Sequence, residues 1–146
     1  MNEYYRIPLK FSDLFKKKEL PRCRDVGESI SQHIHLILTS QFGEYRYDPT
    51  FGCNIWDHDF ENIFINEDWN DRVSGSLKQA IDRHEPRLKN ASVRAEIMQE
   101  EIQPGSKATP MRIKQKVVVH VEGVLSSTNE RFETTQKLYL SPLSYD

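Results

Sequence analysis

The sequence lacks the features typical of a membrane-spanning, a nucleic-acid-binding or an exported protein. No apolar run is long enough for a transmembrane helix, and residues 1–10 lack the apolar core of a signal peptide. A formal net charge of −2 provides no global basic field for nucleic acid. We therefore expect a single-domain cytoplasmic protein with no direct membrane insertion and no nucleic-acid partner.

Cysteine is scarce, and motifs for covalent catalysis are missing. Cys23 and Cys53 lie thirty positions apart and form no Cys-x-x-Cys spacing. Cytoplasmic proteins usually keep thiols reduced, so we expect no disulfide between them. The chain contains no Gly-x-Ser-x-Gly sequence and no phosphate-binding loop. These absences disfavour an enzyme and predict no catalytic residues and no cofactor.

Two groups of residues could form a metal site or a catalytic site, but each has a simpler structural explanation. His33 and His35 point in different directions on a helix, so they are poorly placed to share a metal ion, and we interpret His33 as a hydrogen-bonded core histidine. An acidic cluster comprises Asp57, His58, Asp59 and Glu61. Paired carboxylates can hydrolyse glycosides, but nothing here indicates a raised pKa or a sugar cleft. We therefore predict a solvated loop and no metal site.

The chain divides into an arm and one domain. Residues 1–24 have apolar content without a regular period and are interpreted as an N-terminal arm, followed by a single domain over 25–146. Within the arm, residues 11–18 suit a short helix that ends in a basic run, Lys16-Lys17-Lys18. Either the arm packs its aromatic residues on the domain or it docks on a neighbouring subunit, and the sequence leaves both open.

Two amphipathic helices are predicted in the first half of the domain. The first begins after Asp25, a suitable N-cap with Glu28 three residues on, as in a capping box. Its apolar stripe is Val26, Ile30, His33, Ile34, Ile37 and Leu38. The second runs from about 66–68 to 84 and contains Gly75, which costs about 1 kcal/mol relative to alanine. A close approach of a neighbouring element would account for that glycine.

The second half of the domain is predicted to be a sheet. Alternating apolar residues indicate strands over 91–97, 111–124 and 132–140, and the middle one is apolar on both faces, as in a central strand. The fold class is therefore α+β, with two main helices packed on a mainly antiparallel C-terminal sheet. A polar stretch in the last strand is expected at an exposed edge. It comprises Glu133, Thr134, Thr135, Gln136 and Lys137.

The tripeptide Glu85-Pro86-Arg87 stands where the second helix must stop and a strand begins. Pro86 fixes its own φ and disfavours helical geometry at Glu85. In an extended chain, Glu85 and Arg87 project to the same side, and arginine offers a planar fork of donors to a carboxylate. This pattern indicates either a recognition device or an internal clamp.

With these elements in order, the chain resembles the baseplate wedge family of contractile tails, the gene-product-25 family, whose type VI secretion member is TssE. The resemblance covers about 26–124. The quoted pieces are Leu38-Thr39-Ser40, Gly43-Glu44-Tyr45-Arg46, Asp48-Pro49-Thr50-Phe51-Gly52 and Glu85-Pro86-Arg87, which matches the family's Glu-Pro-Arg motif. Tyr45 interrupts the family's Gly-Glu-Arg-like turn, so Arg46 is displaced by one position.

The resemblance implies a structural role in starting assembly of a contractile sheath, and it favours type VI secretion over a phage tail. It implies that Glu85, Pro86 and Arg87 contact larger wedge proteins, TssF-like and TssG-like. It also implies that the edge over 133–137 faces sheath subunits, TssB-like and TssC-like, by addition of a strand. Two alternatives stay open. One is a peptidoglycan hydrolase using Glu44, Asp57 or Glu61, and the other is a regulatory binding module.

Overall fold

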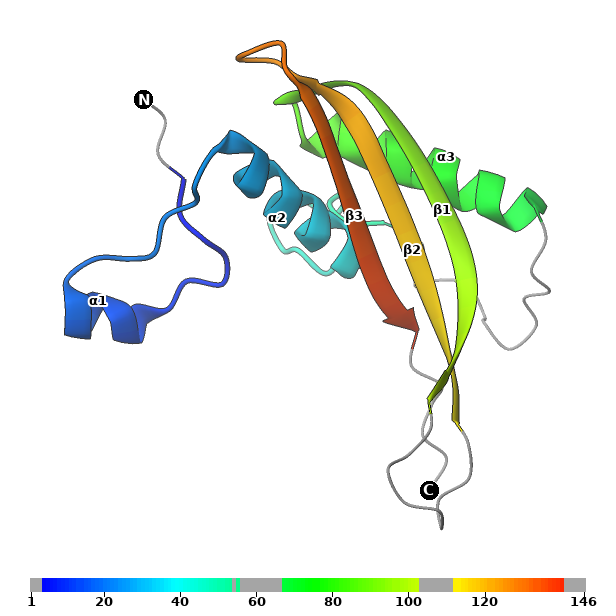
Figure 1. The fold of residues 1–146 in the computed structure, drawn as a ribbon, viewed down its shortest axis with the longest axis horizontal. Coiled ribbons are helices and arrows are strands. Elements are labelled where there is room, and N and C mark those ends of the chain that lie inside the picture. The colour runs from blue at the N-terminus through cyan, green and yellow to red at the C-terminus, as the bar shows by residue number, and fades with distance from the viewer. Residues whose placement is uncertain (1–3, 54, 56–66, 103–111, 141–146) are drawn as a thin grey trace.

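The computed structural model describes residues 4–53, 55, 67–102 and 112–140. Three helices precede three strands along the chain (Figure 1). The helices are α1 (Phe11–Lys17), α2 (Val26–Thr39) and α3 (Glu67–His84), and the strands are β1 (Leu88–Ile102), β2 (Arg112–Leu125) and β3 (Arg131–Leu140). This arrangement confirms the predicted α+β class.

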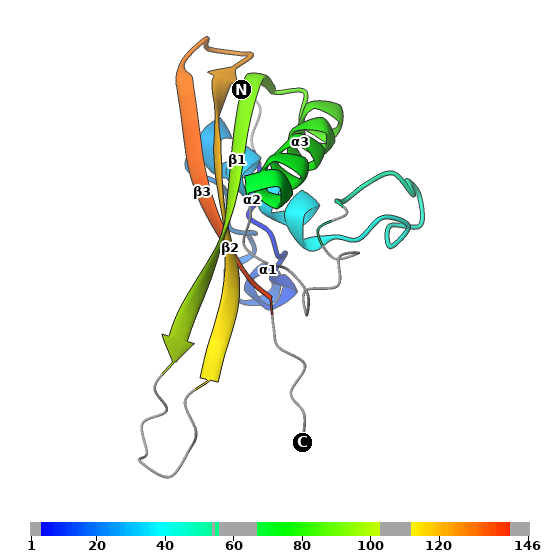
Figure 2. The same cartoon turned by 90° about the vertical axis from the view of Figure 1, so that its right-hand side faces the viewer.

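The strands form one antiparallel sheet in the order β1-β2-β3, so β2 is central as predicted. Figure 2 shows α2 and α3 on the same face of this sheet, with α3 beside β1. Alternate side chains of each strand face these helices, and Ala95, Val119 and Val121 are fully buried there. Burial of these alternating positions forms the core between the sheet and the helices.

Helix α2 begins as its capping residues predict. The Asp25 side chain accepts a hydrogen bond from the Glu28 backbone N–H at 2.8 Å. The Glu28 carboxylate accepts from the Arg24 backbone N–H at 2.7 Å, one residue before the N-cap and not at it. The predicted stripe is buried at four positions, Ile30, Ile34, Ile37 and Leu38. One unsatisfied N–H of the first helical turn, that of Glu28, is thus bound by the Asp25 carboxylate, and the Glu28 carboxylate binds the chain just before the helix.

Helix α3 ends at the predicted residue, but its glycine has a different environment from the one expected. Val73, Leu77 and Ile81 are buried at helical spacing. Gly75 is exposed, and a Cβ added there meets nothing within 4 Å. The expected close approach is wrong because Gly75 lies on the solvent side of α3.

Residues 40–53, which follow α2, form a compact turn that contacts both α2 and α3. The Gly43 N–H donates to the Pro49 carbonyl at 2.9 Å, and Asp48 accepts from the Thr50 N–H at 3.0 Å. Gly52 has φ +116°, and a Cβ there would stand 2.6 Å from the Ser40 carbonyl oxygen. Only glycine therefore fits this close approach without strain.

The N-terminal arm returns on itself before α2. The Arg6 N–H donates to the Pro21 carbonyl at 2.9 Å, and the Cys23 N–H donates to the Tyr4 carbonyl at 2.8 Å. Helix α1, between these paired ends, agrees with the short helix predicted over 11–18. No disulfide joins Cys23 to Cys53 in the structure. Within the described ranges, no helix has both the length and the apolar character needed to cross a membrane.

Candidate partner-binding site

The corner formed by Glu85-Pro86-Arg87 joins α3 to β1 and is fixed from two sides. The Glu85 N–H donates to the Ile81 carbonyl at 2.8 Å and so completes the last helical turn. On the other side, Ser126 in the β2–β3 turn donates its N–H to the Arg87 carbonyl at 2.8 Å and its hydroxyl to the Pro86 carbonyl at 3.1 Å. The corner is therefore held by backbone contacts as well as by its side chains.

Glu85 and Arg87 form a two-pronged ion pair inside the chain. The Arg87 Nε donates to Glu85 Oε1 and its Nη2 donates to Oε2, both at 2.8 Å. The Arg87 backbone N–H adds a third hydrogen bond to Oε1 at 3.2 Å. The sequence left open whether Glu85 and Arg87 pair inside the chain or with a partner. The Glu85 side chain is 0% exposed, so its carboxylate pairs inside the chain.

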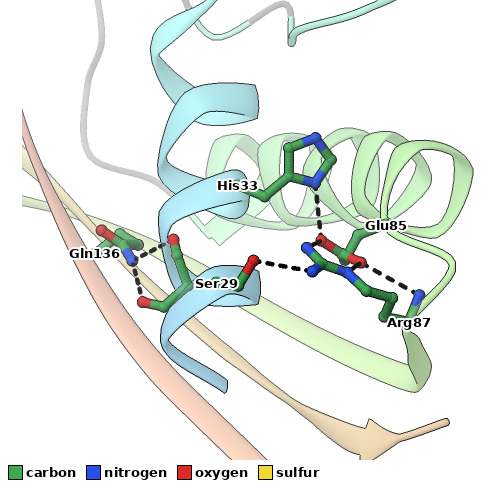
Figure 3. Close-up of polar contacts among 6 residues, drawn as sticks. Ser29, His33, Glu85, Arg87 and Gln136 are labelled. Carbon is green, nitrogen blue, oxygen red and sulfur yellow. Dashed lines mark hydrogen bonds and ion pairs between the residues drawn. The ribbon is translucent and has the colours of Figure 1, made fainter. Parts of the chain in front are cut away.

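Helix α2 supplies two further hydrogen-bond partners of the pair (Figure 3). His33 Nδ1 lies 2.8 Å from Glu85 Oε2, and the Arg87 Nη1 donates to the Ser29 hydroxyl at 2.9 Å. Ser29 and His33 are one helical turn apart, so one face of α2 reaches both charged groups. The network ties α2 to the junction of α3 and β1. It confirms that His33 is hydrogen-bonded, but the His33 side chain is 27% exposed, so the predicted core position is wrong.

The electrostatics of Glu85 reflect these contacts. Burial alone raises the pKa of the Glu85 carboxyl, but hydrogen bonds from Arg87 and His33 outweigh burial and lower that pKa to about 2. The hydrogen bond to Glu85 also raises the pKa of the Arg87 guanidinium. An ionised carboxylate can only accept, so the His33 Nδ1 carries the donated hydrogen.

The arm covers one face of the guanidinium. The Tyr4 ring centroid lies 4.8 Å from the Arg87 Cζ, within the range of a cation–π contact. The Arg87 side chain is still 28% exposed, and Pro86 is exposed beside it. Pro86 and Arg87 are therefore the parts of the tripeptide that present a surface, while Glu85 lies beneath them.

An aromatic groove adjoins this corner. His33, Leu36, Ser40, Glu44, Tyr45 and Phe51 line an open groove of about 530 Å³. The Phe51 ring packs near both His33 and His84, with ring centroids 5.9 Å and 5.1 Å away. The His84 Nε2 is also 3.0 Å from the Thr50 carbonyl oxygen. The turn after α2 and the end of α3 thus form one wall next to the ion pair.

The polar stretch of β3 has two different faces. Thr134 and Gln136 face α2, where the Thr134 hydroxyl lies 2.9 Å from the Ser31 hydroxyl. The Gln136 amide donates to the Ser31 hydroxyl at 3.1 Å and to its carbonyl at 3.3 Å (Figure 3). Glu133, Thr135 and Lys137 are exposed. Among the described strands, β3 pairs only with β2, so it is an edge strand as predicted.

The candidate catalytic and metal-binding residues do not form a further site in the part of the chain that the structure describes. Glu44 is exposed and its carboxylate accepts from the Gln41 N–H at 2.9 Å. The cluster Asp57, His58, Asp59 and Glu61 lies outside the described residues. In the described part of the chain, no group of three or more His, Cys, Asp or Glu side chains is placed to hold a metal ion.

Sequence reasoning missed two members of the network. Ser29 falls outside the apolar stripe of α2, and Tyr4 lies far from Arg87 along the chain. The signal for Ser29 was its position one turn before His33, which places the two side chains on the same face of the helix. No sequence signal pointed to Tyr4, because its contact depends on the path of the arm.

Comparisons with known proteins agree with this fold. The family described as baseplate wedge protein gp25 matches residues 24–130. Baseplate wedge protein gp25 of Enterobacteria phage T4 is 28% identical over 88 residues, which cover 57% of this chain and 65% of that protein. The chain thus matches slightly less than two-thirds of the curated relative's length.

Two solved structures resemble the chain. One, from Geobacter sulfurreducens and provisionally described as a tail lysozyme, is 26% identical with a TM-score of 0.57, over 84% of this chain and 97% of that one. A chain of the baseplate complex from the type VI secretion system is 15% identical with a TM-score of 0.52, over 80% of this chain and 95% of that one. At that identity, the second likeness shows a shared fold.

Proposed function

Because this chain belongs to the baseplate wedge protein gp25 family, we propose that it is a structural baseplate component of a contractile injection system. The single observation that carries the proposal is the family match, which includes α2, α3 and the whole Glu85-Pro86-Arg87 corner. We further propose a type VI secretion system as its setting, supported by the fold shared with that system's baseplate complex. The role is to bind larger wedge proteins and help start sheath assembly.

The proposed contact with larger wedge proteins, TssF-like and TssG-like, is at the α3–β1 corner. Glu85 holds the guanidinium of Arg87 by both oxygens, so the exposed part of Arg87 is fixed in one orientation. An arginine whose orientation is fixed in advance loses less side-chain freedom when a partner binds. Pro86 adds a rigid apolar surface beside it. In this proposal Glu85 acts through Arg87, and Pro86 and Arg87 touch the partner.

The proposed contact with sheath subunits, TssB-like and TssC-like, is the free edge of β3. An edge strand presents backbone N–H and C=O groups that can pair with an added strand. The residues Glu133, Thr135 and Lys137 are exposed there, while Thr134 and Gln136 hold the strand against α2. Anchoring β3 in this way keeps the edge in place for a strand from a neighbouring subunit.

The described residues favour a structural role in the baseplate over a hydrolase activity. Among the residues whose side-chain burial the structure describes, Glu85 is the one buried carboxylate, and its pKa is lowered to about 2. A general acid for glycoside hydrolysis needs the opposite, a raised pKa. The alternative activity, suggested by the description of the Geobacter sulfurreducens structure, would show as dye release from purified cell wall by this protein.

A pull-down from native cells tests the proposal. We expect wild type to recover large wedge proteins, and Pro86→Asp to lose them because it places a carboxylate on the exposed corner. The matched control is Gln79→Asp, which adds the same charge on the exposed side of α3. Melting temperatures of the three proteins should agree. Recovery of no baseplate protein by folded wild type would overturn the proposal.

A further inference from the structure

Helix α1 has an apolar face that nothing in the described chain covers. No α1 residue is buried, and Phe11, Leu14 and Phe15 are 60%, 42% and 85% exposed. Their spacing of three and four residues places them on one side of the helix. Figure 1 shows α1 set apart from the sheet and from α2. A helix of seven residues is too short to be stable alone in water, so a covering surface is expected.

The base of the arm is firmly attached to the domain. The Ile7 N–H donates to the Gln32 side-chain oxygen at 2.9 Å, and the Arg6 guanidinium lies 3.1 Å from the Glu28 carboxylate. The pairing of Tyr5 with Arg22 brings the two ends of the arm together. Residues 8–20 therefore project from a fixed base, which lowers the ordering cost of any contact made by α1.

The same base adjoins the surface proposed to meet a larger wedge protein. The Tyr4 ring lies over the Arg87 guanidinium. Tyr4 is only three residues before Ile7, whose N–H binds Gln32 of α2. A protein that covers Pro86 and Arg87 is thus in contact with the start of the arm. This continuity makes the arm a candidate extension of that interface.

The size of the α1 face limits what it can bind alone. Three side chains on a seven-residue helix bury far less than the roughly 800 Å² per partner of a stable interface. A dimer of this chain held together through α1 alone is therefore not expected. The face suits an added contact within a larger interface.

The charges around α1 indicate the chemistry of the partner. Between residues 10 and 19, four lysines stand against two acidic residues. The lysines are Lys10, Lys16, Lys17 and Lys18, and the acidic residues are Asp13 and Glu19. We propose, resting on the proposed baseplate function, that α1 docks in an apolar groove rimmed by carboxylates, on the same wedge protein that contacts Arg87. The apolar side chains fill the groove and the lysines meet its rim.

Photo-crosslinking in native cells tests this placement. The full chain carries p-benzoylphenylalanine in place of Phe15, of Pro86 or, as a control, of Gln79 on the exposed side of α3. We expect Phe15 and Pro86 to cross-link to one wedge polypeptide. The peptide joined to Phe15 should hold apolar residues flanked by Asp or Glu, and Gln79 should give no such product.

Binding of the purified cross-linked partner provides the second readout. We expect Phe11→Ser/Phe15→Ser to weaken binding about tenfold or more, with an unchanged melting temperature. Tyr47→Ser, at a residue that is 81% exposed, is the matched control and should bind as wild type. Replacing the three lysines at 16–18 by glutamine should also weaken binding and reduce its salt dependence.

Several outcomes would overturn the inference. Cross-links from Phe15 to a second copy of this chain would identify a self-contact instead. Sedimentation of wild type with vesicles of equal parts phosphatidylcholine and phosphatidylglycerol, abolished in the Phe11/Phe15 variant, would identify a lipid surface. If Pro86 cross-links to a wedge protein and Phe15 does not, the inference fails while the proposed function stands. If neither position reaches a baseplate protein, both fail.

Discussion

Arg87 binds the buried carboxylate of Glu85 through both carboxylate oxygens, with two donor–acceptor distances of 2.8 Å. The two residues flank Pro86 at the end of α3, so a local sequence motif forms a pair that is also bonded to α2 through His33 and Ser29. One tripeptide thereby connects both main helices and the first strand. Inside the chain, its contacts hold this junction together.

The first prediction concerns Arg87→Ala. Removing the guanidinium leaves the Glu85 carboxylate buried with His33 as its remaining side-chain partner, and breaking a buried ion pair costs about 3–5 kcal/mol. We expect a fall of that size in the free energy of unfolding, measured by urea denaturation.

The control for this change is Arg94→Ala. The Arg94 side chain is 72% exposed and lies 3.8 Å from Glu96, so its loss should change the free energy of unfolding by less than about 1 kcal/mol. Equal effects of the two substitutions would show that the Glu85–Arg87 pair has no special structural role.

The second prediction concerns acid stability. The pKa of Glu85 is about 2 in the folded chain against an ordinary 4.5, so the folded state keeps this carboxylate ionised where the unfolded state binds a proton. The resulting stability is present above the unfolded pKa and is lost as pH falls from about 5 to about 2. It amounts to about 3 kcal/mol at neutral pH.

Glu85→Gln isolates this contribution, because the amide does not titrate. We expect the free energy of unfolding of wild type to fall more steeply between pH 5 and pH 3 than that of the variant. Urea denaturation at several pH values measures both slopes. Parallel curves would mean that Glu85 has the same pKa in both states.

A third prediction concerns Gly52→Ala. Gly52 has φ +116°, and the added Cβ would lie 2.6 Å from the backbone oxygen of Ser40. Both the backbone conformation and the contact are unfavourable, so the free energy of unfolding should fall by about 1–3 kcal/mol. Thermal unfolding followed by circular dichroism measures the change, and an unaltered melting temperature would contradict the geometry of this turn.

Gly75→Ala is predicted to have the opposite effect. Gly75 lies within α3, is exposed, and has open space around the position of an added Cβ. Alanine has the higher helix propensity, so the free energy of unfolding should rise by about 0.5–1 kcal/mol. A destabilised variant would indicate that a surface packs on this part of α3.

The sequence predicted the elements that depend on local pattern. Asp25 and Glu28 located the start of α2, and Pro86 located the boundary between α3 and β1. Apolar residues on both faces of β2 identified the central strand. These features could be predicted because capping residues, prolines and side-chain periodicity determine the backbone structure of residues close to them in the sequence.

Contacts between distant segments could not be predicted in the same way. The polar stretch of β3 was expected at an exposed edge, but Thr134 and Gln136 turn inward to bond Ser31 of α2. Their direction follows from the strand's period of two together with the position of α2, which no local pattern contains. The contact between Tyr4 and Arg87 depends in the same way on how the arm folds back.

The most direct test of the central claim is sheath assembly in native cells that lack this chain. Fluorescently labelled sheath subunits would be followed by microscopy, with wild type, Pro86→Asp or Gln79→Asp supplied in trans. We predict no extended sheaths without the chain, full restoration by wild type and Gln79→Asp, and strongly reduced restoration by Pro86→Asp at equal protein levels. Normal sheath assembly in its absence would contradict a structural role in the baseplate.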